Sequence, residues 1–328
     1  MAILSLGARP FDEAAAHLPP FLQERLAGVP EELRCRTREI RMRAGGPLRL
    51  TAAEGTIFFT AAGRPTALLP DPCLRLSAQE VAEVFRCLCG YSVHSYTEDV
   101  ARGFLTLPGG HRAGICGTAV TERGGVVSVR NISSINLRVA REIPGAAKAL
   151  CEKIYRNGQL PGLLLAGAPG SGKTTLLRDL AVRLSDGLCG NYVRTVIIDE
   201  RGELAGSRDG IPCCHIGAGT DVLTGYPKGE GILLALRSLS PEIILCDELG
   251  GEEDAAAIAA GLYAGVSFAV SVHAGSLAEA AARPVTRQLL ETGGFGWGCA
   301  LAGPKDPCQI AELRPLHETG TPERMVIV

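Results

Sequence analysis

The sequence carries almost no net charge: its formal value is −2 at pH 7 over 328 residues. A balance this close to zero gives the protein as a whole no attraction for nucleic acid or for an acidic membrane surface. The arginine-rich stretch at residues 34–49 is the best candidate for a local basic patch. We interpret it instead as a solvated strand or helix face.

Metal-binding cysteine patterns and a secretory signal are also missing. The twelve cysteines are scattered without a single Cys-x-x-Cys pair, so the sequence contains no recognisable zinc site. Several of them, such as Cys246, stand in apolar runs and are expected to be small buried residues. Arg9, Asp12 and Glu13 interrupt any early apolar run of the kind that a signal peptide needs. These features favour a reducing, cytoplasmic setting.

Only one uncharged stretch, residues 255–272, calls for comparison with a transmembrane helix, because it has the nominal length of a short one. Ala and Gly dominate this stretch, so its insertion into a bilayer would be weakly favoured. Its pattern divides more naturally into a helix over 252–263, a break at Gly265 and a buried strand over 266–272. We therefore do not expect it to span a membrane.

The composition is that of a folded protein, 46% hydrophobic and 21% charged, with enough length for two domains. Residues 1–140 mix helix and strand patterns and predict an α+β N-terminal domain. Its expected elements are a helical lead-in over 1–30, strands within 37–70, a helix over 77–89 with a capping box, a hairpin over 103–120 that turns at 108–110, and strands within 126–139.

Residues 141–328 follow a different pattern. After a helix over 146–155, apolar strands alternate with helices, which predicts an α/β domain with a mostly parallel sheet. The boundary falls in the Pro- and Gly-containing segment 138–145, which we interpret as a hinge.

The most informative motif is Gly-Ala-Pro-Gly-Ser-Gly-Lys-Thr at residues 167–174, the Walker A pattern. Its glycines allow a tight turn whose N–H groups face phosphate oxygens, and the helix that follows directs its positive end at the same anion. Lys173 is expected to reach the β- and γ-phosphates of ATP, and the Thr174 hydroxyl to ligate Mg²⁺. The residues predicted to bind the nucleotide are Gly167, Ala168, Pro169, Gly170, Ser171, Gly172, Lys173, Thr174 and Thr175.

The residues around this motif fit it. An apolar run over 163–166 predicts a buried parallel strand, and Leu176, Leu180 and Leu184 recur at helical spacing after the loop. Strand, glycine loop and helix thus occur in the order that phosphate binding requires. A plain glycine turn between strand and helix is the weaker interpretation.

A second acidic position follows another apolar strand. Residues 243–246 predict a buried strand that ends at Asp247 and Glu248, at the sheet edge where α/β proteins bind their ligands. Asp247 is expected to hold Mg²⁺ through water, and Glu248 to polarise the attacking water. This pair favours ATP hydrolysis over nucleotide binding alone.

Two further strand ends carry candidate residues. The strand over 195–199 ends at Asp199 and Glu200, which would act on Mg²⁺ or on water from a greater distance, or form only a structural salt bridge. The strand over 266–272 ends at His273, which is placed to sense the γ-phosphate by hydrogen bonding. Taken alone, a single histidine is more often structural.

These four elements, in this order, resemble the secretion-type ATPases of the RecA-like class, in which a Walker A loop, an acidic Asp box, a Walker B strand and a His box succeed one another. The corresponding segments here are 167–174, 195–200, 243–248 and 268–273. The resemblance narrows to the stage III sporulation protein AA family. The segments that carry it are 199–206, 220–231 and 237–242, together with 103–115 and 134–141 in the N-terminal half.

That resemblance implies a RecA-like P-loop ATPase that uses ATP and Mg²⁺ in the mother cell during endospore formation. The family is thought to energise a channel complex between mother cell and forespore. This protein would then act as a ring, a homo-hexamer, docked at the cytoplasmic face of a membrane complex and membrane-associated only through its partners. Secretion ATPases often lack the Asp of the Walker B pair, so Asp247 departs from their pattern and strengthens the case for hydrolysis.

Arginines complete the predicted site. In ring ATPases, arginines from a neighbouring subunit or from the N-terminal domain approach the γ-phosphate. Arg112, Arg138 and Arg141 are the candidates, because the hinge would place them near the cleft, and Arg237 and Arg283 are weaker ones. For each of them a surface or interdomain salt bridge is an equal alternative.

The sequence leaves two other functions open. RecA-like domains also serve nucleic-acid-binding or remodelling motors, and fold alone does not separate the two uses. ATPase stimulation by single-stranded RNA or DNA, with a steep salt dependence, would mark that alternative. A nucleotide-gated scaffold that barely turns ATP over is the second one, and the Asp247–Glu248 pair argues against it.

Overall fold

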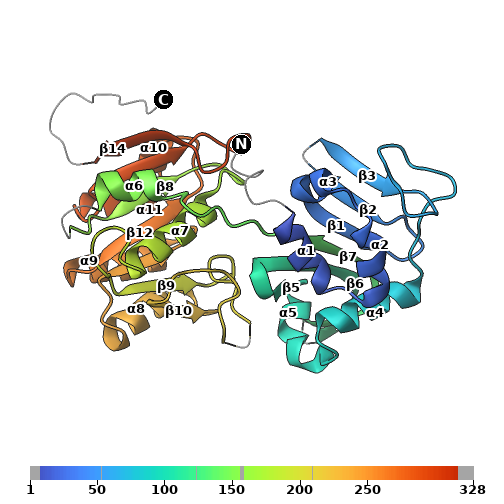
Figure 1. The fold of residues 1–328 in the computed structure, drawn as a ribbon. Coiled ribbons are helices and arrows are strands. Elements are labelled where there is room, and N and C mark those ends of the chain that lie inside the picture. The colour runs from blue at the N-terminus through green and yellow to red at the C-terminus, as the bar shows by residue number, and fades with distance from the viewer. Residues whose placement is uncertain (1–7, 53, 123, 156–158, 209, 317–328) are drawn as a thin grey trace. The chain divides into compact units, whose positions relative to one another are not determined.

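The computed structural model of the chain describes residues 8–52, 54–122, 124–155, 159–208 and 210–316 (Figure 1). The chain divides between Arg141 and Glu142 into two compact units. Among the described residues each unit contains one seven-stranded sheet, in the order β4-β3-β2-β1-β7-β6-β5 in the N-terminal unit and β10-β9-β11-β12-β8-β13-β14 in the C-terminal unit. The predicted fold class, a mostly parallel α/β sheet preceded by an α+β region, is confirmed.

The N-terminal sheet is antiparallel throughout. Its strands are β1 (Thr37–Arg43), β2 (Arg49–Ala52), β3 (Gly55–Phe59), β4 (Pro65–Thr66), β5 (Phe104–Leu107), β6 (His111–Glu122) and β7 (Gly125–Arg138). Strand residues such as Ile40, Met42 and Leu137 share one buried core with the helices α1 (Arg9–Ala16), α2 (Pro20–Ala27), α4 (Ala78–Leu88) and α5 (Thr97–Ala101). The helix α3 (Glu31–Arg36) and the 3-10 turn η2 (Val93–Tyr96) complete this unit, with the 3-10 turn η3 (Pro108–Gly110) at the β5–β6 turn.

Local sequence signals act here as expected. The helix α4 begins with the predicted capping box, in which the Ser77 hydroxyl accepts from the Glu80 N–H and the Glu80 carboxylate accepts from the Ser77 N–H. The β5–β6 hairpin turns at η3, where Gly109 adopts a left-handed φ of 80°. Of the helical lead-in predicted over 1–30, residues 1–7 lie outside the described residues, and α1 and α2 occupy most of the rest.

His111, at the start of β6, is buried in this unit. Its Nδ1 accepts a hydrogen bond of 3.0 Å from the backbone N–H of Ala140, while its Nε2 has no hydrogen-bond partner among the described residues. Burial, and secondarily the charge of His17, lower the pKa of His111 to about 4. The imidazole is therefore neutral in the folded protein. The lone pair of its Nδ1 accepts the hydrogen bond from the Ala140 N–H, which holds the end of the N-terminal unit.

This buried histidine predicts a pH-dependent stability. An unfolded histidine binds a proton below about pH 6.5, whereas folded His111 does so only near pH 4, so its contribution weakens as the pH falls through this window. From pH 7 to pH 5 we expect the free energy of unfolding to fall by about 2 kcal/mol through His111. Hydrogen-exchange protection of β6 amides measures this loss. The variant His111→Gln should lack this part of the loss in unfolding free energy. An equal dependence of the unfolding free energy on pH in both proteins would contradict the assignment.

The C-terminal sheet is parallel in β8 (Leu163–Ala166), β9 (Thr195–Asp199), β10 (Thr220–Thr224), β11 (Ile243–Cys246), β12 (Ser267–Val272) and β13 (Trp297–Leu301), and β14 (Ile310–Pro315) joins β13 antiparallel. Both faces are buried at β8, β9, β11 and β12, which explains why the sequences of these strands are mostly apolar. Leu163 and Leu165 pack with α6 (Lys148–Ile154) and α7 (Lys173–Ser185) on one face. Leu164 and Ala166 face the other side, with α8 (Lys228–Ser238), α9 (Glu252–Tyr263), α10 (Leu277–Ala282) and α11 (Pro284–Glu291).

The uncharged stretch 255–272 contains most of α9 and the whole of β12, as its pattern predicts. In the described part of the chain, no helix combines the length and the apolar character that a membrane crossing needs. The sequence reasoning missed β10, β13 and the antiparallel edge strand β14. Their patterns are short, and that of β14 includes Pro315 and alternates with polar residues.

The helix α7 is tied to the segment that opens the C-terminal unit. The Asp179 carboxylate accepts hydrogen bonds of 2.8 Å from the backbone N–H groups of Gly145 and Ala147. Arg183, one turn further along α7, pairs with the same carboxylate at 2.8 Å. Because all three groups are partly or fully buried, these bonds are stronger than a surface ion pair and fix the segment to the helix.

Candidate active site

The phosphate loop connects β8 to α7 and depends on its glycines. A Cβ at Gly167 would lie 2.4 Å from the Ser171 hydroxyl and 3.2 Å from Cγ of Lys173. Gly172 has a left-handed φ of 94°, and a Cβ there would meet the backbone nitrogen of Cys308 at 2.7 Å. No other residue type fits these positions without displacing the loop, so the tight turn that the Walker A pattern predicts is built into the backbone.

Lys173 occupies the interior of this loop. Its side chain is 6% exposed, and its ammonium donates to the carbonyl oxygens of Gly167 at 2.9 Å and Ala168 at 3.3 Å and lies 3.0 Å from Nδ1 of His273. Burial lowers the pKa of this lysine, and the charges of Asp247 and Glu248 offset that effect only in part. No carboxylate contacts the ammonium directly among the described residues, an arrangement that would favour an anion brought close to it.

Asp247 connects the first turn of α7 to the ends of β11 and β12. Its Oδ2 accepts from the Thr174 hydroxyl at 2.5 Å, and its Oδ1 accepts from the Ser271 hydroxyl. Thr174 opens α7, Asp247 follows β11 and Ser271 lies in β12, so this carboxylate joins the phosphate loop to the sheet edge. The structure thus brings together the two residues predicted to hold Mg²⁺.

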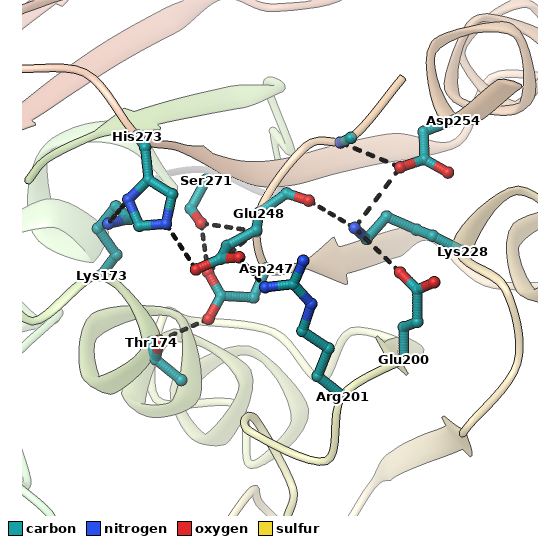
Figure 2. Close-up of polar contacts among 11 residues, drawn as sticks. Lys173, Thr174, Glu200, Arg201, Lys228, Asp247, Glu248, Asp254, Ser271 and His273 are labelled. Atoms are coloured by element: carbon teal, nitrogen blue, oxygen red, sulfur yellow. Dashed lines mark hydrogen bonds and ion pairs between the residues drawn. The ribbon is translucent and has the colours of Figure 1, made fainter. Parts of the chain in front are cut away.

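Glu248 lies in the centre of the site, held on several sides (Figure 2). Its backbone has a left-handed φ of 51°, which a residue other than glycine adopts only at a cost. The backbone N–H donates to the Ser271 hydroxyl at 2.9 Å, while the carboxylate lies 2.6 Å from Nε2 of His273 and forms an ion pair with Arg201. The predicted base and the predicted sensor histidine are therefore in direct contact.

The surroundings keep the Glu248 carboxylate ionised. Burial alone would raise the pKa of this group, but the hydrogen bond and charge of His273, followed by the charges of Arg201 and Lys173, lower it below its ordinary value. The carboxylate thus keeps its charge across the neutral pH range, the form that can accept a proton from water.

The two acids at the end of β9 have separate environments. Asp199 is buried, and its two oxygens accept from the backbone N–H groups of Glu203, Leu204, Ala205 and Gly206. It therefore organises the loop that follows β9, and its predicted action on Mg²⁺ or water stays a prediction. Arg178 of α7 secures the same loop through the carbonyls of Glu203 and Leu204.

Glu200 points toward the site and is 41% exposed. Its carboxylate pairs at 3.6 Å with the ammonium of Lys228. Of the two interpretations left open for this residue, the structure displays the salt bridge. A cavity of about 20 Å³ is lined by Glu200, Lys228, Asp247, Glu248 and their neighbours, which is room for one water molecule.

Three residues with contacts to the site were missed by the sequence reasoning: Lys228, Ser271 and Arg201, whose guanidinium pairs with the Glu248 carboxylate. Lys228, the first residue of α8, donates to the backbone carbonyl of Glu248 at 2.5 Å, and Ser271 in β12 contacts both Asp247 and Glu248. Ser271 stands inside an apolar strand and is completely buried, a position where a hydroxyl needs a partner. A serine inside an apolar strand was therefore the sequence signal that could have identified Ser271. Lys228 carried no comparable pattern.

The candidate arginines have other contacts. Arg112 lies over the Phe104 ring at 3.5 Å, Arg138 ends β7 opposite Arg112 and Glu39, and Arg141 donates to the carbonyls of Arg34 and Thr37 at 3.0 Å. All three belong to the N-terminal unit. Arg283 pairs with Glu279 at 3.3 Å, and Arg237 lies in the last turn of α8. An approach of any of these arginines to a phosphate stays a prediction.

The residues of the loop and the sheet edge fit ATP and Mg²⁺. The Ser171 hydroxyl is buried without a hydrogen-bond partner among the described residues, and the backbone at Gly167 encloses a space that a Cβ would fill. The Thr174 hydroxyl and an Asp247 oxygen, the type of ligands that Mg²⁺ takes beside phosphate, already touch each other. Thr175 instead borders a cavity of about 280 Å³ beside Gly145 and Arg178.

The parallel sheet, with its phosphate loop after β8 and its acidic residues after β11, belongs to a fold that solved structures of ATPases share. The chain belongs to the family described as sporulation stage III, protein AA, whose model matches residues 25–317. The stage III sporulation protein AA of Bacillus subtilis (strain 168) is 36% identical over 303 residues, which cover 92% of this chain and 94% of that protein.

Solved structures agree on the fold. The ATPase DotB of Legionella pneumophila aligns with a TM-score of 0.52 and 18% identity, over 86% of this chain and 76% of DotB. The pilus retraction motor PilT with bound ADP aligns with a TM-score of 0.50 and 16% identity, over 80% of this chain and 74% of PilT. At these identities the likeness concerns the fold.

Proposed function

We propose that the protein is an Mg²⁺-dependent ATP hydrolase that works as a ring, a homo-hexamer, and energises a mother cell–forespore channel complex during endospore formation. The observation that carries the proposal is a set of direct contacts among residues that follow three strands of the parallel sheet. Thr174, after β8, donates to Asp247, after β11. Lys173 lies within hydrogen-bond distance of His273, after β12, and His273 lies within hydrogen-bond distance of Glu248. Membership of the sporulation family supports the proposed role in endospore formation, and the folds of DotB and PilT support the proposed ATPase.

Each residue has a part in hydrolysis. Lys173 leaves its loop carbonyls for the β- and γ-phosphates, and the Glu248 carboxylate withdraws a proton from the water whose oxygen bonds to the γ-phosphorus as the bond to the bridging oxygen breaks. His273, in contact with both residues, orients Glu248 and reports whether the γ-phosphate is present. Mg²⁺ held through Thr174 and Asp247 would neutralise phosphate charge.

The function is tested by ATP turnover measured against protein concentration. We expect phosphate release that requires Mg²⁺, stops with EDTA and returns when excess Mg²⁺ is added. Specific activity should rise steeply with concentration, because the arginines that complete the site come from a neighbouring subunit. Failure to release phosphate at any concentration with Mg²⁺ would contradict hydrolysis by this chain. Strong, salt-sensitive stimulation by single-stranded RNA would favour the nucleic-acid motor instead.

A further inference from the structure

Lys228 is an unusual lysine, because it is buried at the start of a helix. Its side chain is 5% exposed, although the first turn of a helix carries a partial positive charge that disfavours a cation. Taking an ammonium out of water is costly unless it is paired. Helix stability and packing therefore do not explain why a lysine is buried here. Its polar and charged partners do.

The partners of Lys228 are arranged around one end of the active site (Figure 2). The ammonium donates to the carbonyl oxygen of Glu248 at 2.5 Å, and Glu200 and Asp254 compensate its charge, each at 3.6 Å. These two separations are longer than direct hydrogen bonds, and the cavity of about 20 Å³ beside the ammonium has room for a bridging water.

The bond to Glu248 acts on a strained backbone. The left-handed conformation at Glu248 persists only when its surroundings fix it. Ser271 holds the N–H side of this residue, and the next N–H, that of Leu249, donates to the Ser271 carbonyl at 2.8 Å. On the carbonyl side of Glu248 the partner is Lys228. Without that bond, the peptide after Glu248 keeps only the hydrogen bond of Leu249, and the backbone that carries the carboxylate is less firmly fixed.

We propose that Lys228 is a positioning residue for hydrolysis: it fixes the peptide carbonyl of Glu248 and thereby aims the carboxylate at the attacking water. This inference rests on the proposed ATP hydrolysis. Glu200 and Asp254 serve it by holding the ammonium in place. Lys228 touches no reacting atom in this arrangement, so its removal should change the rate of the chemical step and leave ATP binding nearly intact.

The variant Lys228→Met keeps the length and apolar stem of the side chain and removes the ammonium. We expect kcat to fall by about 10²-fold, the cost of a small misplacement of a reacting group, with the Kd for ATP within about threefold of wild type. Lys148→Met, at an exposed lysine on α6, is the matched control and should retain wild-type kcat. In a Glu248→Gln background, Lys228→Met should lower single-turnover rates little further, because both changes act through one carboxylate.

A purely structural role makes a different forecast. Lys228→Met leaves the partly buried Asp254 without its cation, which lowers the melting temperature, and adding Asp254→Asn should recover that stability. We expect kcat to stay low in this double variant. Recovery of kcat together with stability, or an unchanged kcat in Lys228→Met, would overturn the positioning role while wild-type turnover still supports the hydrolase. Absence of turnover in the wild type would refute the proposed function, and this inference with it.

Discussion

Glu248→Gln should reduce ATP turnover by about 10²–10⁴-fold, the usual contribution of a general base. Glutamine keeps the shape of the side chain and an oxygen that can stay bonded to His273, but it cannot accept a proton from water. The contact with His273 at 2.6 Å and the ion pair with Arg201 place this carboxylate at the centre of the site, so no neighbouring acid takes over its position.

The same variant should bind ATP at least as tightly as the wild type. The substitution removes a negative charge from the side of the loop that receives the γ-phosphate, which weakens repulsion of the nucleotide. Turnover by phosphate release and affinity by a fluorescent ATP analogue measure the two effects. Glu252→Gln, at an exposed acid in the first turn of α9, is the matched control and should leave both unchanged. A kcat for Glu248→Gln close to that of the wild type would remove Glu248 from the mechanism.

Lys173→Ala should weaken ATP binding by about 10²-fold or more, because charged hydrogen bonds to phosphate contribute about 1.5–3 kcal/mol each. Turnover at ordinary ATP concentrations should disappear with it. The free protein should not unfold more easily, since burial already disfavours the lysine charge and its partners are backbone carbonyls.

Calorimetric titration with ATP and a thermal melt distinguish these effects. Lys148→Ala removes a solvent-exposed lysine of the same unit and should behave as wild type in both. A stable Lys173→Ala protein that still binds ATP with wild-type affinity would contradict the phosphate role. Loss of stability alone would mean that the lysine supports the loop rather than its ligand.

Elements with strong local signals could be predicted from the sequence. The apolar run of β8, the glycine loop and the leucines of α7 are adjacent in the chain, and the Ser77–Glu80 capping box fixes the start of α4 within four residues. The convergence of Asp247 and His273 was also foreseeable, because parallel strands present their carboxyl ends at one edge.

What escaped prediction depends on contacts between distant residues. Lys228 precedes Glu248 by twenty positions, and nothing in its local pattern reveals that α8 turns its first residue toward the end of β11. Asp199 looked like a ligand because it ends an apolar strand. Its four backbone donors come from the loop that follows, whose path the sequence does not specify. An approach of the arginines to a phosphate, from a neighbouring subunit or from the N-terminal domain, stays a prediction.

One consequence follows from the way Asp179 fastens Gly145 and Ala147 to α7. Phosphate would bind at the first residue of this helix, and Asp179 lies six residues further on, about 9 Å along the axis. The helix thus joins two places: the predicted phosphate site at its first turn, and the segment after the N-terminal unit, which is bonded to Asp179 in its middle. If nucleotide binding or release shifted this helix, Asp179 would pass the movement directly to Gly145 and Ala147.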